Sequence, residues 1–223
     1  MNRWALFVSA LALVLPSSLR RVLLNTLSGY AIERGARVGA SLLGCPALKM
    51  ATGAIIGHFN VIKGVPVEMG GHARIGDFNW ISGLPRGAAR HFREEMERDP
   101  RLVLEAHASL TSRHYVDCSN RVRIGEFTTV AGARSQILTH AIDFVRNRQV
   151  SAPVDIGKYC FVGTACVVLK GARLPDCSVL AAHSSLARAF EETFTLYSGV
   201  PATPVKALPR DAAYFHRDRG YVE

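Results

Sequence analysis

Eight histidines give the chain its most versatile side chains, and His140 differs from the others in its position. It follows Thr139 and opens the segment 141–153, AIDFVRNRQVSAP. An imidazole titrates near neutral pH, so it can accept a proton during a reaction or ligate a metal. A catalytic zinc site needs three converging protein ligands. His107, His114 and His140 contain no close pair a few residues apart, so their spacing does not favour a metal site.

The cysteines are the second group that could carry chemistry. Their number is odd and no CxxC pair occurs; they are Cys45, Cys118, Cys160, Cys166 and Cys177. This pattern predicts neither a disulfide framework nor a zinc ribbon. Free, mostly buried thiols in a reducing compartment fit the pattern better, so we expect a cytoplasmic protein.

Length and composition describe a globular protein. The 223 residues suffice for one sizeable domain or at most two small ones, with 48% hydrophobic and 20% charged residues. The net charge of +9 favours an anionic partner: nucleic acid, an acidic membrane surface or a phosphorylated small molecule. The arginines are scattered and no aromatic platform lies between them, so nucleic acid is the least favoured and we expect none.

A six-residue repeat runs through most of the chain and must position these side chains. An aliphatic residue recurs at every sixth position in three blocks, most clearly at Ile156, Val162, Val168, Leu174, Leu180 and Leu186. An earlier block fails only at Gly44 and continues through Met50 to Ile62. The phase then shifts by one residue and resumes at Met69. Glycine often follows the aliphatic residue, and a small residue often stands four positions after it.

A period of six matches neither the 3.6 of a helix nor the alternation of a lone strand. It fits a short strand followed by a turn, with three such units forming one triangular coil. The aliphatic residue then points inward and the small residue occupies the corner. The sequence therefore predicts an all-β protein, a left-handed parallel β-helix over residues 31–190. Cys160 and Cys166 fill small-residue positions, which favours a buried structural role over a redox or nucleophilic one.

Two segments break the period and are predicted to leave the solenoid as loops. They are residues 84–101, LPRGAARHFREEMERDPR, and residues 141–153. Insertions in solenoids often cluster at a binding face, which favours a function for the second loop because His140 opens it. For the first loop, function and a solvated excursion stay equally open. Residues 191–223 are predicted to form an exit strand and a tail that caps the open end.

The N-terminal residues 1–30 are predicted to form a helical segment. The apolar run WALFVSALALVL ends before Pro16 and is too short to span a bilayer, which takes about 20 residues. Without a convincing cleavage site, a secretory signal is disfavoured. The segment either packs on the body or lies in a membrane interface, which would be the inner face, and both alternatives stay open.

The sequence resembles the hexapeptide-repeat acyltransferases over about residues 31–206. The resemblance rests on Thr139-His140, the loop ending at Pro153, Val162-Gly163-Thr164 and the exit motif GVPA at residues 199–202. The branch most similar in style contains galactoside, maltose and nodulation-factor acetyltransferases and the O-acetyltransferases of bacterial exopolysaccharide clusters. The repeat alone is specific for fold and weak for function.

The resemblance implies an O-acetyltransferase that moves an acetyl group from acetyl-CoA to a hydroxyl of a sugar or polysaccharide precursor. His140 matches the family's catalytic base, which would deprotonate the hydroxyl during direct transfer. His114 and Asp117, about one coil earlier, are candidates for contacts with the acceptor. Asp143, three residues after His140, is a further candidate there, and orienting the imidazole is one role open to it.

The resemblance also implies a homotrimer with coenzyme A in a groove between neighbouring β-helices. By position it assigns Gly163, Thr164 and Ala182 to backbone contacts with the cosubstrate acetyl-CoA. Arg188 and Lys206 are candidates for its phosphates, since cations are needed there. His183 stands where the family usually has glycine, a departure that bears on the pantetheine contacts. No metal is expected.

Three alternatives remain. A γ-type carbonic anhydrase shares the fold but needs converging histidines. A non-catalytic β-helix that serves as an assembly subunit would not bind coenzyme A. A third enzyme would use a nucleotide-activated sugar or an acyl-carrier protein, but no glycine-rich phosphate loop supports it.

Overall fold

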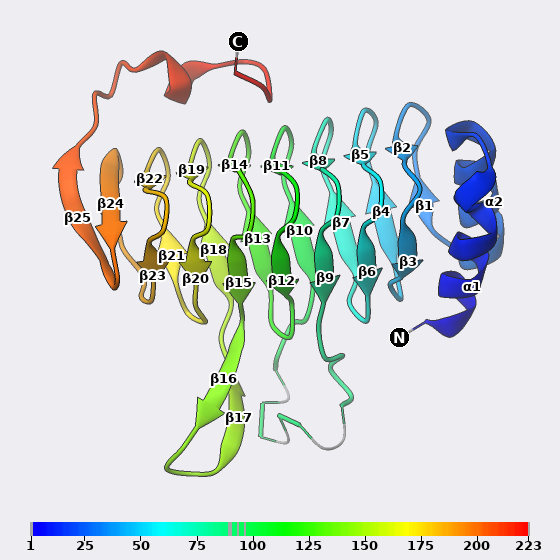
Figure 1. The fold of residues 1–223 in the computed structure, drawn as a ribbon, viewed down its shortest axis with the longest axis horizontal. Helices are drawn as coiled ribbons and strands as arrows, with labels where there is room; N and C mark the ends of the chain where they lie inside the picture. The colour runs from blue at the N-terminus through cyan, green and yellow to red at the C-terminus, as the bar shows by residue number, and fades with distance from the viewer. Residues whose placement is uncertain (1, 89–90, 93, 96, 223) are drawn as a thin grey trace.

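A computed structural model of the chain describes residues 2–88, 91–92, 94–95 and 97–222. Figure 1 shows a long prism of stacked coils with helices at the N-terminal end and two excursions from one side. The strands pair in parallel, coil upon coil, in three sheets of seven, nine and seven strands. The predicted left-handed parallel β-helix is confirmed.

Each coil contributes one strand to each sheet in turn. Sheet A contains β1 (Ala31–Ile32), β4 (Leu48–Met50), β7 (Val67–Met69), β10 (Leu102–Leu104), β13 (Val122–Ile124), β18 (Val154–Ile156) and β21 (Arg173–Leu174). Sheet B contains β2 (Arg37–Val38), β5 (Ile55–Ile56), β8 (Arg74–Ile75), β11 (Ser109–Leu110), β14 (Thr129–Val130), β19 (Phe161–Val162), β22 (Val179–Leu180), β24 (Thr195–Gly199) and β25 (Ala202–Ala207). Sheet C contains β3 (Leu42–Gly44), β6 (Val61–Lys63), β9 (Trp80–Ser82), β12 (Tyr115–Asp117), β15 (Gln136–Leu138), β20 (Val167–Val168) and β23 (Ser185–Leu186).

The aliphatic repeat fills the interior of the prism. The inward residues of the last block, Ile156 to Leu186 in steps of six, are all buried. Where the phase fails at Gly44, the inward position belongs to Leu43, which is fully buried. The coil is therefore intact there, and the repeat has only slipped by one residue.

Polar side chains stack at the corner between sheets B and C. The Asn60 Oδ1 accepts a hydrogen bond from Asn79 N at 2.8 Å, and the Asn79 Oδ1 accepts one from His114 N at 2.9 Å. The ladder continues through the Nδ1 of His114, which accepts from Ser135 N at 3.2 Å. Each rung satisfies a backbone N–H of the next coil, as a buried amide requires.

Both insertions leave the corner between sheets C and A. Residues 83–101 connect β9 to β10, and residues 139–153 connect β15 to β18. The second insertion is an antiparallel hairpin of β16 (His140–Asp143) and β17 (Arg148–Ser151). The coil that contains β12 lies between the two insertions, so both surround the same stretch of corner (Figure 1). Residues 89, 90, 93 and 96 of the first predicted loop lie outside the described residues.

Helices α1 (Arg3–Leu11) and α2 (Ser17–Ser28) cover the N-terminal end, joined by the short helix η1 (Ala12–Val14). Buried Ala5, Val8 and Leu24 belong to the same core as the coils, so the helical segment packs on the body. Asn2 caps α1 by accepting a hydrogen bond from Ala5 N at 3.0 Å. Among the described residues, no helix has the length and apolar character needed to cross a membrane.

The C-terminal end differs from the predicted exit strand and capping tail. Strands β24 and β25 form an antiparallel hairpin that extends sheet B beyond β22, with a cis peptide bond between Val200 and Pro201 at its turn. The tail then runs back along the corner between sheets A and B (Figure 1). There the Tyr214 hydroxyl donates to Cys160 O at 3.0 Å, and Arg217 lies over the ring of Tyr159. Residue 223 lies outside the described residues.

Candidate active site

His140 and Asp117 meet at the corner where the two insertions leave the solenoid. His140 begins strand β16, and Asp117 ends strand β12 of the preceding coil. Their Nδ1 and Oδ2 atoms lie 2.7 Å apart. The side chain of His140 is 36% exposed whereas that of Asp117 is only 5% exposed. The imidazole can therefore reach a substrate while its carboxylate partner cannot.

The carboxylate of Asp117 is held by a dense set of donors. Its Oδ2 accepts hydrogen bonds from the backbone N–H of Thr139 at 3.0 Å and from the Thr139 hydroxyl at 2.8 Å. Its Oδ1 accepts from the Ser119 hydroxyl at 2.6 Å and from Ser119 N at 3.1 Å. Burial alone would raise the pKa of Asp117, but the hydrogen bonds from His140, Ser119 and Thr139 outweigh it and bring the pKa to about 2. The group is ionised at neutral pH.

This carboxylate fixes the state of the imidazole. An ionised carboxylate only accepts hydrogen bonds, so Nδ1 of His140 carries the proton and Nε2 presents its lone pair when the ring is neutral. The hydrogen bond to Asp117 raises the pKa of His140 above its usual range, burial opposes the rise, and the charge of Arg98 also lowers it. The pair therefore supplies a base that is more basic than free histidine.

The first insertion covers one side of this pair. The ring of Phe92 lies edge-on to that of His140, with centroids 6.0 Å apart. The guanidinium of Arg98 lies 4.2 Å from the centre of the Phe92 ring. Arg98 is buried and donates to the carbonyl oxygens of Leu84 at 2.8 Å, Pro85 at 2.7 Å and Ser119. Arg98 thus ties the loop to the coil of Asp117 and positions Phe92 against the imidazole.

The two insertions contact each other beside His140. The Glu95 carboxylate accepts hydrogen bonds from the hydroxyl of Ser151 at 2.5 Å and from its backbone N–H at 3.0 Å. Ser151 stands opposite His140 in the hairpin register. Glu94 and Arg148 form an ion pair between the same two segments. A loop whose function the sequence left open therefore contributes directly to the site.

A cleft lies between the insertions. Its lining includes Phe92 and Glu95 from the first loop and Asn147, Arg148 and Gln149 from the hairpin. Within the described part of the chain, the Oε1 of Gln149 and the Nε of Arg148 are shielded from solvent without a hydrogen-bond partner. Buried polar atoms ordinarily have partners, so two unpaired ones beside this cleft are unusual. Because Phe92 lines this cleft and packs edge-on against His140, the cleft adjoins the pair of His140 and Asp117.

Two of the acceptor-side candidates have other roles in the structure. The Asp143 carboxylate accepts from the backbone N–H groups of Val145 at 3.0 Å and Arg146 at 3.1 Å, inside the hairpin turn. Asp117, not Asp143, orients the imidazole. His114 is a buried rung of the corner ladder, and its Nε2 lies 2.9 Å from the Thr111 hydroxyl. Its burial excludes the expected direct contact with an acceptor.

The candidates for coenzyme A do not form one cluster. Gly163, Thr164 and Ala182 stack on the corner between sheets B and C, where an added Cβ on Gly163 would lie 2.6 Å from Ala182 N. That corner and the corner of His140 border sheet C on opposite sides. Arg188 follows β23 and shares the corner of His140, with its guanidinium over the Phe190 ring. Lys206 is exposed on β25 at the C-terminal end of sheet B.

The cysteines are placed as small buried residues. Cys160 and Cys166 are buried, and their thiols donate to Pro175 O at 3.0 Å and Ala181 O at 3.1 Å. Burial raises the pKa of Cys160 to about 12, so its nucleophilic thiolate is scarce. Within the described ranges, no group of three or more histidine, cysteine or acidic side chains is arranged to hold a metal ion.

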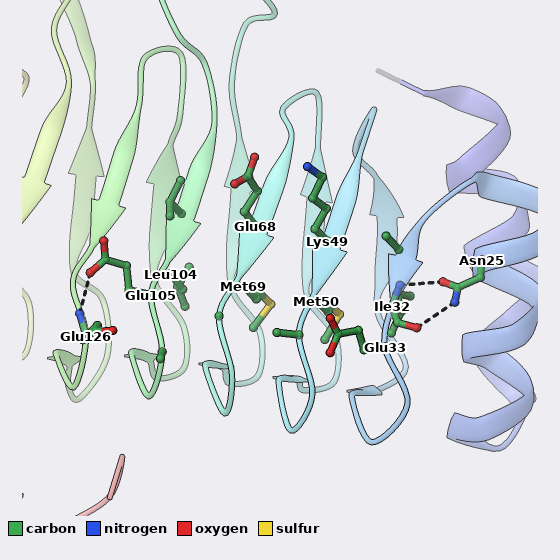
Figure 2. Close-up of a pocket in the computed structure, with 15 residues that line it drawn as sticks. Asn25, Ile32, Glu33, Lys49, Met50, Glu68, Met69, Leu104, Glu105 and Glu126 are labelled. Carbon is green, nitrogen blue, oxygen red and sulfur yellow. Dashed lines mark hydrogen bonds between the residues drawn. The ribbon is translucent and has the colours of Figure 1, made fainter. Parts of the chain in front are cut away.

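A separate groove runs along the outer face of sheet A over the N-terminal coils (Figure 2). Four glutamates line it, and three of them have side-chain partners. Glu105 is paired with Arg123 at 2.7 Å and Glu68 with Arg101 at 3.1 Å, while Glu33 accepts from Thr52. The groove is thus a charged sheet surface and forms no part of the His140 site.

Comparisons with known proteins agree with this architecture. No protein-family model matches the chain, and no curated protein sequence matches it. Among solved structures, a variant of the N-acyltransferase AntD from Bacillus cereus, in complex with coenzyme A and dTDP-4-amino-4,6-dideoxyglucose, is 15% identical with a TM-score of 0.54, covering 79% of this chain and 88% of that one. The polysialic acid O-acetyltransferase OatWY is 16% identical with a TM-score of 0.52, covering 80% and 84%. The chain has the fold of the hexapeptide-repeat acyltransferases. The resemblance expected from the sequence is therefore confirmed for the fold.

Several residues of this hexapeptide-repeat site were not singled out from the sequence. Ser119 and Thr139 hold the carboxylate of Asp117, and Phe92, Glu95 and Arg98 come from a loop without any period. The sequence did contain one usable signal. Asp117 pairs with Leu138 in the register of β12 and β15, which places it next to the two residues that follow β15.

Proposed function

We propose that the protein is an acyl-CoA-dependent O-acyltransferase, with His140 as general base and Asp117 as the residue that positions it. The hydrogen bond between His140 Nδ1 and Asp117 Oδ2 carries this proposal. It leaves Nε2 free to accept a proton on a partly exposed imidazole. The combination of a buried ionised carboxylate and a half-exposed histidine suits proton abstraction from a hydroxyl, which is a weak nucleophile at neutral pH.

The chemistry follows from that arrangement. Nε2 of His140 takes the proton of the acceptor hydroxyl as its oxygen attacks the thioester carbonyl carbon of acetyl-CoA. Asp117 stabilises the imidazolium, and a backbone N–H near the corner is the expected donor to the oxyanion. The carbon–sulfur bond then breaks, and the coenzyme A thiolate takes the proton back from His140. Direct transfer is favoured over an acyl-cysteine because the thiols of Cys160 and Cys166 are buried and their pKa values are raised.

The acceptor is proposed to enter the cleft between the two insertions. Asn147, Arg148 and Gln149 line this cleft with polar side chains. The shielded Oε1 of Gln149 has no partner in the described part of the chain, and it would accept a hydrogen bond from a hydroxyl once the amide turns toward the cleft. A polyhydroxylated ring presents such donors in number, which supports a sugar or glycan acceptor. The complexes of the structural neighbours point the same way: AntD was solved with coenzyme A and a dTDP-linked amino sugar, and OatWY is named for polysialic acid.

Acetyl-CoA is proposed to lie along the corner formed by Gly163, Thr164 and Ala182, with Arg188 and Lys206 as candidate contacts for its phosphates. Within one chain, this corner and His140 lie on opposite sides of sheet C. We therefore propose a homotrimer in which the Thr164 corner of one copy faces His140 of the next. Such an arrangement would join the donor and acceptor sites.

Sheet C is the face best suited to that assembly. Its outer row includes Val61, Trp80 and Tyr115, which are in register, and both aromatic rings are exposed. The outer face of sheet A is occupied by ion pairs such as those of Arg123 with Glu105 and Asp155. Sheet B is partly covered by the tail, where Tyr214 packs on Phe161. Exposed aromatic rings are enriched in interfaces between proteins.

The proposed location is the cytoplasm, at the inner face of the membrane. All five cysteines are free thiols, as in a reducing compartment.

Calorimetric titration with acetyl-CoA tests the proposed function and separates it from a non-catalytic assembly subunit. The wild-type protein is expected to bind, and Ala182→Glu is expected to weaken binding by about tenfold or more, because it adds bulk and negative charge at the proposed corner. Ala40→Glu, on the same corner near the N-terminus, is the matched control and should bind like the wild type. An absence of binding to the wild-type protein would contradict the acyltransferase proposal.

A further inference from the structure

The N-terminal helices expose six large apolar side chains away from the coils, here called the cap face. It consists of Trp4 (56% exposed), Phe7 (55%), Leu11 (59%), Val14 (89%), Leu19 (55%) and Val22 (51%). Spacings of three and four residues from Trp4 to Val14 place four of them on one side of the helical segment. Exposed large apolar residues are unremarkable singly, but a contiguous group marks an interaction surface.

The cap face does not hold the helices on the solenoid. That task belongs to the opposite side, where Ala5, Val8, Ala12 and Leu24 are buried. Arg20 reinforces the joint, because its buried guanidinium donates to Ala12 O at 2.9 Å and to Val38 O at 2.7 Å. The helical segment thus has two apolar sides: one packs on the coils and the other faces outward.

The charge of the N-terminal stretch that contains the cap face is mainly positive. Residues 1–49 contain six cationic side chains but a single carboxylate, that of Glu33. The Glu33 carboxylate accepts hydrogen bonds from the backbone and the hydroxyl of Thr52, both at 2.8 Å. Arg20 is buried, and the remaining cations, at Arg3, Arg21, Arg34, Arg37 and Lys49, are exposed or half-buried.

We propose that the cap face docks on the surface of an anionic lipid bilayer. An apolar helical face with cations beside it enters the boundary between headgroups and acyl chains, and each cation adds attraction to anionic lipids. Trp4 is suited to that boundary, since its ring is exposed while its indole N–H donates to Leu27 O at 2.8 Å. A second copy of the chain is a poorer partner, because joining two cap faces would bring like charges together.

Docking in this way sets the height of the catalytic corner above the lipid. Helix α1 packs on β3, and sheet C continues through β6, β9 and β12 to β15, which precedes His140. Four strand spacings of about 4.8 Å place His140 about 19 Å beyond β3. The helical layer adds about 10 Å. If the proposed acyl transfer holds, His140 is then at a height where it can reach a hydroxyl of a glycan attached to a lipid. The docking itself does not depend on that transfer.

The test is co-flotation of the full-length protein with vesicles of phosphatidylcholine alone and of phosphatidylcholine with 30% phosphatidylglycerol. Wild type should float with the anionic vesicles, and 0.5 M salt should weaken its partition about tenfold. The double variant Phe7→Ser/Leu11→Ser should bind them about tenfold more weakly or worse. The matched control is Phe144→Ser/Val145→Ser at the hairpin tip, whose side chains are 88% and 96% exposed; it should float like wild type.

Two further measurements distinguish membrane docking of the cap face from self-association. In a Trp80→Phe background Trp4 is the only tryptophan, and its selectively excited emission should shift to the blue on addition of anionic vesicles. Sedimentation without vesicles should be the same for wild type and Phe7→Ser/Leu11→Ser. Equal flotation of wild type and the cap variant would overturn the proposal, as would loss of flotation in the hairpin variant alone. A sedimentation change confined to the cap variant would also overturn it, by assigning the face to self-association.

Discussion

His140 and Asp117 are 23 residues apart in the sequence, yet their side chains are joined by a 2.7 Å contact between Nδ1 and Oδ2. The solenoid brings them together because one coil stacks directly on the next. The deeper residue is the carboxylate and the more accessible one is the imidazole. The buried carboxylate of Asp117 therefore fixes the proton on Nδ1 of His140, and Nε2 stays free to accept a proton from a substrate.

Replacing Asp117 by asparagine should change the pH dependence of the reaction as well as its rate. In wild type the hydrogen bond to Asp117 raises the pKa of His140, so the acid limb of kcat/KM should lie above pH 6.5. In Asp117→Asn that limb should move to lower pH. The plateau rate should fall by about 10²- to 10⁴-fold, because asparagine neither fixes the proton on Nδ1 nor stabilises the positive charge of the imidazolium.

Asp143→Asn is the matched control for this experiment. Its carboxylate accepts hydrogen bonds from Val145 and Arg146 within the hairpin turn. The profile should keep its acid limb and change in height by less than about threefold. An unchanged limb in Asp117→Asn would show that Asp117 does not position His140.

His114 should make the protein sensitive to mild acid. Burial lowers the pKa of His114 to about 4, so the unfolded chain binds more protons than the folded one between pH 6.5 and 4. Stability contributed by the neutral ring is therefore complete above pH 6.5 and is lost as the pH falls toward 4. Between pH 7 and pH 5 the loss should amount to about 2 kcal/mol.

The variant His114→Asn should remove this sensitivity. Asparagine already forms the rungs at Asn60 and Asn79, and its Oδ1 can accept from Ser135 N as the imidazole does. Urea unfolding at pH 7 and pH 5 measures the difference. His183→Asn, at an exposed corner, should keep the wild-type pH dependence. Equal pH dependence in His114→Asn and wild type would contradict the assignment.

Gln149 should matter for acceptor binding more than for the chemical step. Gln149 lines the cleft between the insertions, and its shielded Oε1, which lacks a partner in the described part of the chain, gains one when the amide turns toward a bound acceptor. Gln149→Met keeps the length of the side chain but removes the acceptor atom. The KM for the glycan should rise about tenfold, because the substitution removes one hydrogen bond to the acceptor. The kcat and the affinity for acetyl-CoA should change little. A KM equal to that of wild type would place the acceptor elsewhere.

The fold could be predicted from the sequence because the repeat is local. Each inward aliphatic residue and each small corner residue is fixed by six-residue spacing, so even the slip from Gly44 to Leu43 left the coil recognisable. The site was only partly predictable. His140 could be found at the mouth of an insertion, but the role of Asp117 depends on which coil stacks against which. The 84–101 insertion carries no period from which the placement of Phe92 and Arg98 could be derived.

Steady-state rates of acetyl transfer from acetyl-CoA to a panel of sugar and glycan acceptors, compared between wild type and His140→Ala, decide whether His140 is the general base. We expect turnover by wild type on at least one acceptor and a fall of about 10²- to 10⁴-fold in the variant. Calorimetry should show an unchanged affinity for acetyl-CoA, since His140 acts on the acceptor hydroxyl. Full activity in His140→Ala would contradict the account.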